Sequence, residues 1–181
     1  MKKLILFSAF ALALVMTTSA QTFKLGAKAG ANFASLNGDG ADELGLDGLT
    51  SFHFGAVAEI GISDKFAFQP ELLYSAQGGS VADIEFNLDY ITVPLLAKFK
   101  VGSGFAIEAG PQVGFLVNDE VLGVDLNADS FDFGFNAGVS YKLPANGLFF
   151  QARYNIGLSE IAEDADTRNG VFQVSVGYFF L

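Results

Sequence analysis

The chain has 181 residues, of which 51% are hydrophobic and only 17% are charged, so it is long enough for one domain and too apolar for a disordered protein. Its net charge of −10 excludes the basic face that binds nucleic acid, so no nucleic-acid partner is expected. The absence of Cys excludes disulfides, thiolate metal sites and a lipoprotein anchor. The 20 Phe and 21 Gly residues are typical of β proteins with tight turns rather than of helical proteins.

The first segment has the layout of a cleaved secretory signal. A positively charged start precedes an uncharged apolar run, Leu4–Val15, and then a few small residues. This run is too short to cross roughly 30 Å of hydrocarbon as a helix, which disfavours a transmembrane anchor. We therefore expect a signal peptide over residues 1–20, with cleavage between Ala20 and Gln21, and a barrel domain over residues 21–181.

After the signal segment, alternation with a period of two recurs along the chain and predicts β-strands with two different faces. One face carries mostly Phe, Tyr, Leu, Ile, Val or Ala, and the other carries mostly Gly, Asn, Gln, Ser or a single charge. Most runs reach the roughly 9–11 residues that a tilted strand needs to cross a bilayer. In chain order, the eight runs are Lys24–Phe33, Phe52–Ile62, Phe66–Gln77, Leu88–Lys100, Phe105–Val117, Phe131–Lys142, Leu148–Leu158 and Gly170–Leu181.

Soluble and membrane barrels share this alternation, and the choice between them depends on which face points outward. A lipocalin-like barrel keeps its apolar face inside, whereas a membrane barrel turns it to the lipid. The polar face here is rich in Gly and sparsely charged, which suits the narrow lumen of an eight-stranded barrel better than a water-exposed surface. Aromatic residues near the ends of the runs fit the interfacial girdles of a membrane barrel. They are Phe33, Phe52, Phe66, Phe99, Phe105, Phe131, Tyr141, Phe150 and Phe180.

These patterns predict an all-β fold, an eight-stranded antiparallel up-and-down transmembrane β-barrel that follows a cleaved signal peptide. An even number of strands returns both ends of the chain to one side of the membrane. Outer-membrane lipid and lipopolysaccharide are therefore the expected surroundings and partners of the barrel.

The connections between the runs alternate in length, which predicts the orientation of the barrel. Bacterial outer-membrane barrels have short periplasmic turns and longer extracellular loops. We therefore expect periplasmic termini and four long extracellular loops. The short connections are Ser63–Lys65, Val101–Gly104 and Leu143–Gly147. The long connections are Ala34–Ser51, Gly78–Asn87, Asn118–Ser130 and Ser159–Asn169.

The long connections are rich in Asp and Glu, and Arg168 alone opposes them. Within the first of them, the segment Asn37–Glu43 suggests a calcium site, but its spacing does not match an EF-hand loop. We expect a solvated acidic rim at the cell surface, with no metal site and no cofactor. Binding of divalent cations by these loops stays open as an alternative.

Six charged residues alternate with the apolar residues of their runs and therefore fall on the predicted inner face, which we call inward parity. Buried charges need partners. We therefore predict that the three cationic side chains pair with the three glutamates inside the barrel and that this network is structural. Eight strands leave little free bore, which favours a plugged lumen over the alternative of a narrow pore or small-ligand carrier. The six residues are Lys28, Glu59, Glu71, Lys98, Glu108 and Arg153.

His53 is the only His in the chain, and it is expected to point inward near the outer rim. A Ser–His–acid hydrolase of outer-membrane lipids would need this His beside a Ser and a carboxylate. Ser51 is near in sequence, but the Gly-x-Ser-x-Gly motif of many hydrolases is absent. We therefore expect no catalytic residue and no enzymatic activity, and keep a lipid-modifying hydrolase as an alternative.

Six sequence segments carry a resemblance to a known family. They are Gly26–Phe33, Gln69–Ser75, Tyr90–Leu96, Glu108–Gly114, Arg153–Leu158 and Gly177–Phe180. In this order they resemble the PorT-type small outer-membrane β-barrel proteins typical of Bacteroidota, over nearly the whole chain after the signal segment. The resemblance implies an outer-membrane barrel domain with no one assigned activity, so a structural or surface-interaction role is expected.

The end of the chain bears on how the barrel is inserted. Outer-membrane barrels usually close on an aromatic residue that the barrel-assembly machinery reads, and the resemblance makes this machinery an expected partner. Here Leu181 follows the aromatic Phe180, which is a small departure from that pattern. Any other protein partner is left open.

Overall fold

The structure is a computed structural model that describes residues 22–37, 47–48, 50–81, 84–118, 120–121, 124–125, 131–158 and 168–181. The expected signal peptide over residues 1–20 and its cleavage point between Ala20 and Gln21 lie outside these residues. Most of the segment Asn37–Glu43 also lies outside them.

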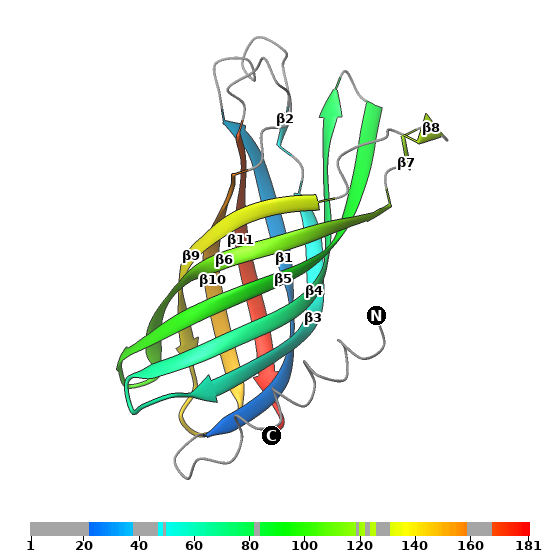
Figure 1. The fold of residues 1–181 in the computed structure, drawn as a ribbon. Helices are drawn as coiled ribbons and strands as arrows, with labels where there is room; N and C mark the ends of the chain where they lie inside the picture. Colours follow the sequence, from blue (N-terminus) through cyan, green and yellow to red (C-terminus); the bar gives the residue numbers. More distant parts are fainter. Residues whose placement is uncertain are drawn as a thin grey trace, which may run out of the picture.

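Eight long antiparallel strands form the wall of a barrel (Figure 1). They are β1 (Phe23–Asn37), β3 (Thr50–Gly61), β4 (Phe66–Val81), β5 (Ile84–Gly102), β6 (Phe105–Asn118), β9 (Phe131–Lys142), β10 (Leu148–Gly157) and β11 (Arg168–Phe179). Three strands of two residues each lie in the connections at one end of the barrel: β2 (Asp47–Gly48), β7 (Glu120–Val121) and β8 (Val124–Asp125). Within the described residues, no helix is long and apolar enough to cross a membrane.

The sheet closes on itself through the pairing of its first and last long strands. Each long strand pairs with the next one along the chain, and β11 then pairs with β1 from Gly26↔Phe179 to Asn37↔Arg168. Closure satisfies the backbone donors and acceptors that an open sheet would present to hydrocarbon. The predicted fold class, a closed eight-stranded antiparallel barrel, is confirmed.

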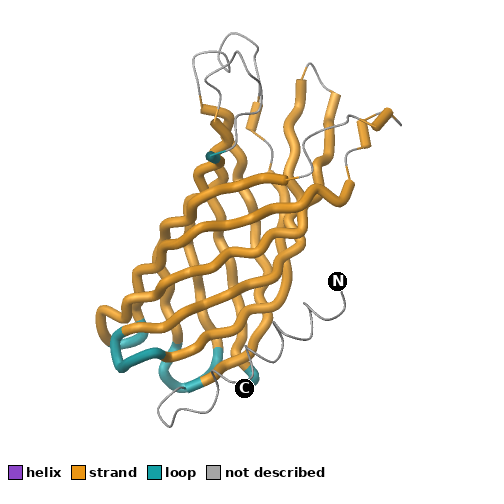
Figure 2. Tube along the Cα trace, viewed as in Figure 1, coloured by secondary structure: helices purple, strands orange, loops and turns teal. Residues whose placement is uncertain are grey.

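Each predicted run coincides with one long strand, but one predicted connection is wrong. Strands β4 and β5 remain paired through the segment Gly78–Asn87, as far as Val81↔Ile84, and project beyond the rest of the barrel (Figure 2). The predicted connection begins with Gly78 and Gly79, yet these residues pair with Asn87 and Phe86 inside the ladder. Glycine weakens a strand but does not prevent its backbone from pairing. The strands on either side of the predicted connection therefore continue into it as a paired hairpin.

Side-chain burial alternates along the strands with opposite chemistry on the two faces. In β9, Phe135 is 42% exposed on the outer face, whereas the neighbouring Asn136 is fully buried on the inner face. Large apolar side chains such as Ile107 and Val139 share the outer face, and amides, hydroxyls and charges fill the inner face. This arrangement is that of a barrel surrounded by lipid rather than by water.

Tight turns and both described chain ends lie together at one end of the barrel, which we call the short-turn end (Figure 2). The β5–β6 turn contains two residues with positive φ, Gly102 (137°) and Gly104 (97°), a backbone conformation that other residues rarely adopt. At the closing seam, the Leu25 amide donates a 3.1 Å hydrogen bond to the Leu181 carbonyl. The last residues of the chain are thereby tied to its first strand.

Candidate functional site

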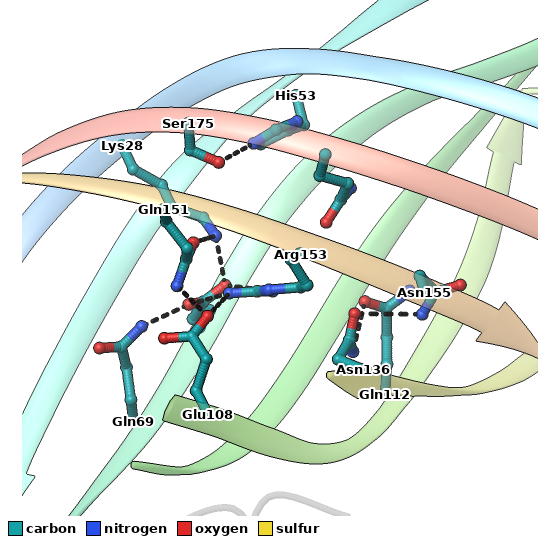
Figure 3. Close-up of polar contacts among 12 residues, drawn as sticks. Lys28, His53, Gln69, Glu108, Gln112, Asn136, Gln151, Arg153, Asn155 and Ser175 are labelled. Atoms are coloured by element: carbon teal, nitrogen blue, oxygen red, sulfur yellow. Dashed lines mark hydrogen bonds and ion pairs between the residues drawn. The ribbon is translucent and has the colours of Figure 1, made fainter. Parts of the chain in front are cut away.

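The centre of the lumen holds a cluster of four charged side chains from four different strands (Figure 3). Glu71 on β4 accepts two bonds from the Arg153 guanidinium of β10, at 2.8 and 3.1 Å. The second carboxylate oxygen of Glu71 also lies 2.8 Å from Lys28 Nζ on β1, and Arg153 Nη2 lies 3.4 Å from Glu108 Oε1 on β6. All four side chains are essentially buried. Two cations therefore face two carboxylates, and the cluster is electrically balanced.

Two glutamines complete this central cluster. Gln151 accepts a 2.6 Å hydrogen bond from Lys28 Nζ and donates its amide hydrogen to Glu108. Gln69 donates a 2.6 Å hydrogen bond to Glu71. These amides reduce the cost of removing the charges from water, because each buried donor or acceptor without a partner makes an ion pair less stable. Glu108 Oε2 and Arg153 Nε are still without a hydrogen-bond partner among the described residues.

A second charged cluster lies toward the short-turn end. The Glu59 carboxylate of β3 is shared between two ammonium groups, Lys24 on β1 and Lys98 on β5, with the Lys98 contact at 3.1 Å. Lys98 also donates a 2.8 Å hydrogen bond to Gln69, which links this cluster to the central one. Two cations share one carboxylate here, so the second cluster has an excess of positive charge.

The structure brings all six sequence-predicted lumen residues into these two clusters. Each predicted cation contacts a predicted glutamate, while Gln69, Gln151 and Lys24 were missed as members of the network. The only sequence signal for them was inward parity, which all three share with the six predicted residues. Parity gives the face on which a side chain lies but not the partner that it meets across the lumen.

His53 takes part in a separate hydrogen-bonded chain on the inner face, which contains no carboxylate. Its Nδ1–H donates to Asn32 Oδ1 at 2.7 Å. Its Nε2 accepts from the Ser175 hydroxyl at 2.8 Å (Figure 3). Asn32 is fixed in this orientation because its amide nitrogen donates to the Phe52 and Ala76 carbonyls, at 3.2 and 2.9 Å. Its amide oxygen must therefore be the acceptor.

The hydrogen bonds run in the same direction as in a serine hydrolase triad, from the Ser hydroxyl to His and from His to a third side chain. Here the third side chain is an amide instead of an acid. Ser51, the serine near His53 in sequence, instead donates to the Ala76 carbonyl at 2.6 Å. His53 and Asn32 are at most 1% exposed and Ser175 is 5% exposed, so the chain lies on the inner face and away from the lipid that such an enzyme would attack. The geometry accounts for His53 as a hydrogen-bonded side chain of the lumen.

Amide side chains form a further polar layer. Asn155 of β10 donates to Asn136 of β9, which in turn donates to Gln112 of β6, both at 3.2 Å (Figure 3). Toward the short-turn end, Val57, Phe149 and Phe179 instead form a small apolar cluster inside the barrel. Within the residues that the structure describes, no group of three or more His, Asp or Glu side chains could hold a metal ion.

Residues 19–163 match the family described as outer membrane protein beta-barrel domain. The chain belongs to this family. The protein is thus an outer-membrane β-barrel protein. Its closer resemblance to PorT-type proteins stays a prediction. No curated protein matches the sequence.

Solved structures similar to the outer-membrane barrel agree in fold. Neisserial surface protein A matches with a TM-score of 0.57 and 18% identity, covering 90% of this chain and 100% of the other. The attachment invasion locus protein Ail of Yersinia pestis matches with a TM-score of 0.56 and 14% identity, covering 87% and 98% of the two chains. A structure of Ail in complex with the heparin analogue sucrose octasulfate matches with a TM-score of 0.54 and 14% identity, covering 87% and 99%. At these identities the likeness concerns the fold alone.

Proposed function

We propose that this outer-membrane barrel has a structural or surface-interaction role and that its lumen is plugged. The observation that carries the proposal is the central cluster, in which Lys28, Glu71, Glu108 and Arg153 meet across the lumen from four strands. An ion path would need charged groups that face water. Here the charges face one another, and the glutamines and the His53 chain occupy adjacent space.

The orientation that fits this role places the short-turn end in the periplasm and the long connections at the cell surface. The alternation of connection lengths supports it, because outer-membrane barrels have that asymmetry. The acidic loops would then be the part of the molecule that meets other cells, host molecules or lipopolysaccharide. The names of two barrels of the same fold, a surface protein and an attachment protein, are in line with such a role.

The plug is tested by recording single-channel currents of the purified protein in planar lipid bilayers. We expect no large, sustained conductance, because the central cluster spans the lumen. Glu71→Gln serves as the matched variant, since it unbalances the central cluster without shortening a side chain. A large, sustained current through the wild-type protein would contradict the plug and favour the narrow pore.

The orientation is tested by labelling single cysteines, since the chain has none of its own. Ala162→Cys lies in the long connection between β10 and β11, and Ser103→Cys lies in the short β5–β6 turn. A membrane-impermeant maleimide added to intact cells should label the first variant and not the second, while both should react after lysis. The reverse labelling would overturn the orientation without affecting the fold.

A further inference from the structure

A cavity of about 660 Å³ opens at the short-turn end, and its lining is cationic although the protein as a whole is acidic. Five of the eight basic residues that follow Gln21 line this cavity, against two carboxylates, Glu59 and Asp64. Three positive charges are therefore in excess. The five lysines are Lys24, Lys65, Lys98, Lys100 and Lys142.

Two of these lysines are already paired with a carboxylate, and three are not. Lys24 and Lys98 share Glu59, as described above. Within the described part of the chain, Lys65, Lys100 and Lys142 form no ion pair. Like charges held in one cavity repel each other unless an anion lies among them.

The backbone fixes the positions of the three unpaired lysines. The Lys100 amide donates a 2.8 Å hydrogen bond to the Lys65 carbonyl, which joins β5 to the β3–β4 turn. The Lys142 amide donates a 2.8 Å hydrogen bond to the Gly104 carbonyl, which joins β9 to the β5–β6 turn. The backbone of these lysines is therefore held in place around the opening of one cavity. Less conformational entropy is lost when a ligand orders their side chains.

The cavity also has an apolar side that faces the membrane. Phe99, Val101 and Phe105 line it and are at the same time exposed on the outer face of the barrel. Phe105 packs against Tyr141 with ring centroids 4.5 Å apart, as in an interfacial aromatic girdle. The cavity thus holds a cluster of ammonium groups next to the aromatic girdle, at the depth of the lipid head groups.

We propose that this cavity binds a phosphate-bearing anion of the size of glycerol phosphate, either as the head group of an anionic phospholipid or free in solution. Phosphate oxygens point in several directions and accept hydrogen bonds from several lysines at once. The volume lies within the roughly 300–1,000 Å³ of ordinary ligand sites. This site is distinct from the proposed surface role and does not depend on the orientation of the barrel.

The test compares the wild-type protein with Lys65→Gln/Lys100→Gln/Lys142→Gln, whose three side chains make no ion pair in the described structure. The matched control is Lys65→Arg/Lys100→Arg/Lys142→Arg, which keeps the positive charge. A second control, Arg168→Gln, removes one charge at the opposite end of β11. The mobility of unheated samples on SDS gels checks that each barrel is folded.

Two arms distinguish the sources of phosphate. In the first, native mass spectrometry measures retention of phosphatidylglycerol by barrels extracted from mixed phosphatidylglycerol and phosphatidylethanolamine vesicles. In the second, calorimetry measures binding of soluble glycerol 3-phosphate. We expect the triple Gln variant to bind about tenfold more weakly or worse, and the triple Arg variant and Arg168→Gln to bind like the wild type. Binding should also weaken as salt is raised.

Loss in the lipid arm identifies a head-group site, and loss in the soluble arm alone identifies a site for a free phosphate compound. Equal binding by the wild-type protein and the triple Gln variant, or no binding in either arm, overturns the proposal. Should the triple Gln variant fail to fold, Lys65→Glu replaces it, because this exposed turn residue can be reversed in charge without touching the barrel wall.

Discussion

Among the charged residues that the structure describes, Glu71 carries the most interactions in the lumen. Its carboxylate accepts from Lys28, from both terminal nitrogens of Arg153 and from Gln69. No other described glutamate binds two buried cations of the central cluster. The stability of the lumen therefore depends more on this one negative charge than on any other.

We predict that Glu71→Gln lowers the free energy of unfolding by about 3–5 kcal/mol, because it leaves two buried cations facing Glu108 alone. The measurement is a denaturant titration in lipid vesicles, followed by the mobility of unheated samples on SDS gels, since the chain has no Trp for fluorescence.

The control is Glu71→Gln/Arg153→Gln, which removes one charge of each sign. Lys28 and Glu108 then remain, connected through Gln151, so the cluster is balanced again. The double variant should recover at least part of the lost stability. If it is less stable than Glu71→Gln alone, the balance of charge is not what stabilises the lumen.

At the scale of residues, parity in the sequence was enough to predict which charges lie inside. It could not predict that Glu59 pairs with Lys24 as well as Lys98, because partners across a lumen depend on strand tilt and register. The contact between His53 and Ser175 was missed for the same reason: 122 positions separate the two residues, and only closure of the barrel brings them together.

At the scale of elements, the β5–β6 turn at the short-turn end depends on glycines with positive φ. Gly104 has a φ of 97°, and a Cβ added there would lie 2.3 Å from the Lys142 carbonyl oxygen. A side chain at this position would meet both an unfavourable backbone conformation and a backbone clash. The neighbouring Ser103 is exposed and belongs to the same turn.

We predict that Gly104→Ala destabilises the barrel by about 1–3 kcal/mol, whereas Ser103→Ala changes its stability little. The same denaturant titration measures both variants. Equal stability of the two variants would show that the β5–β6 turn relaxes without cost and that its geometry does not constrain β5 and β6.

The strands themselves were predictable because each face repeats its chemistry every second residue. Their ends were less so, as the β4–β5 hairpin shows: Gly78 and Gly79 look like a loop but lie in a paired ladder. Local composition indicates only whether a residue by itself favours a strand or a loop. It does not report whether a partner strand is present to accept its backbone hydrogen bonds.

At the scale of the whole molecule, the lipid-facing surface is the feature that separates this barrel from a soluble one. Phe135 lies well inside β9 and Phe131 lies at its start, and both are exposed on the outer face. A charge placed on this face should therefore be penalised according to its depth in the bilayer.

We predict that Phe135→Arg destabilises the barrel by about 2–4 kcal/mol and Phe131→Arg by about 1 kcal/mol or less, since the cost of a charge falls toward the interface. The measurement is again unfolding in lipid vesicles. In detergent micelles, which adapt around a charge, the gap between the two variants should shrink. A gap of equal size in micelles would point to packing rather than to depth.

The seam between β1 and β11 also sets the order of events during biogenesis. Phe23 is among the first barrel residues to leave the ribosome and Phe179 among the last, yet their strands must be neighbours. The wall therefore cannot become continuous until β11 has been synthesised. Until then, its Phe-rich strands have unpaired edges that are prone to aggregate in an aqueous compartment. We therefore expect these strands to need protection from aggregation before insertion, and we expect barrel closure to be the pairing of the first and last strands to be synthesised.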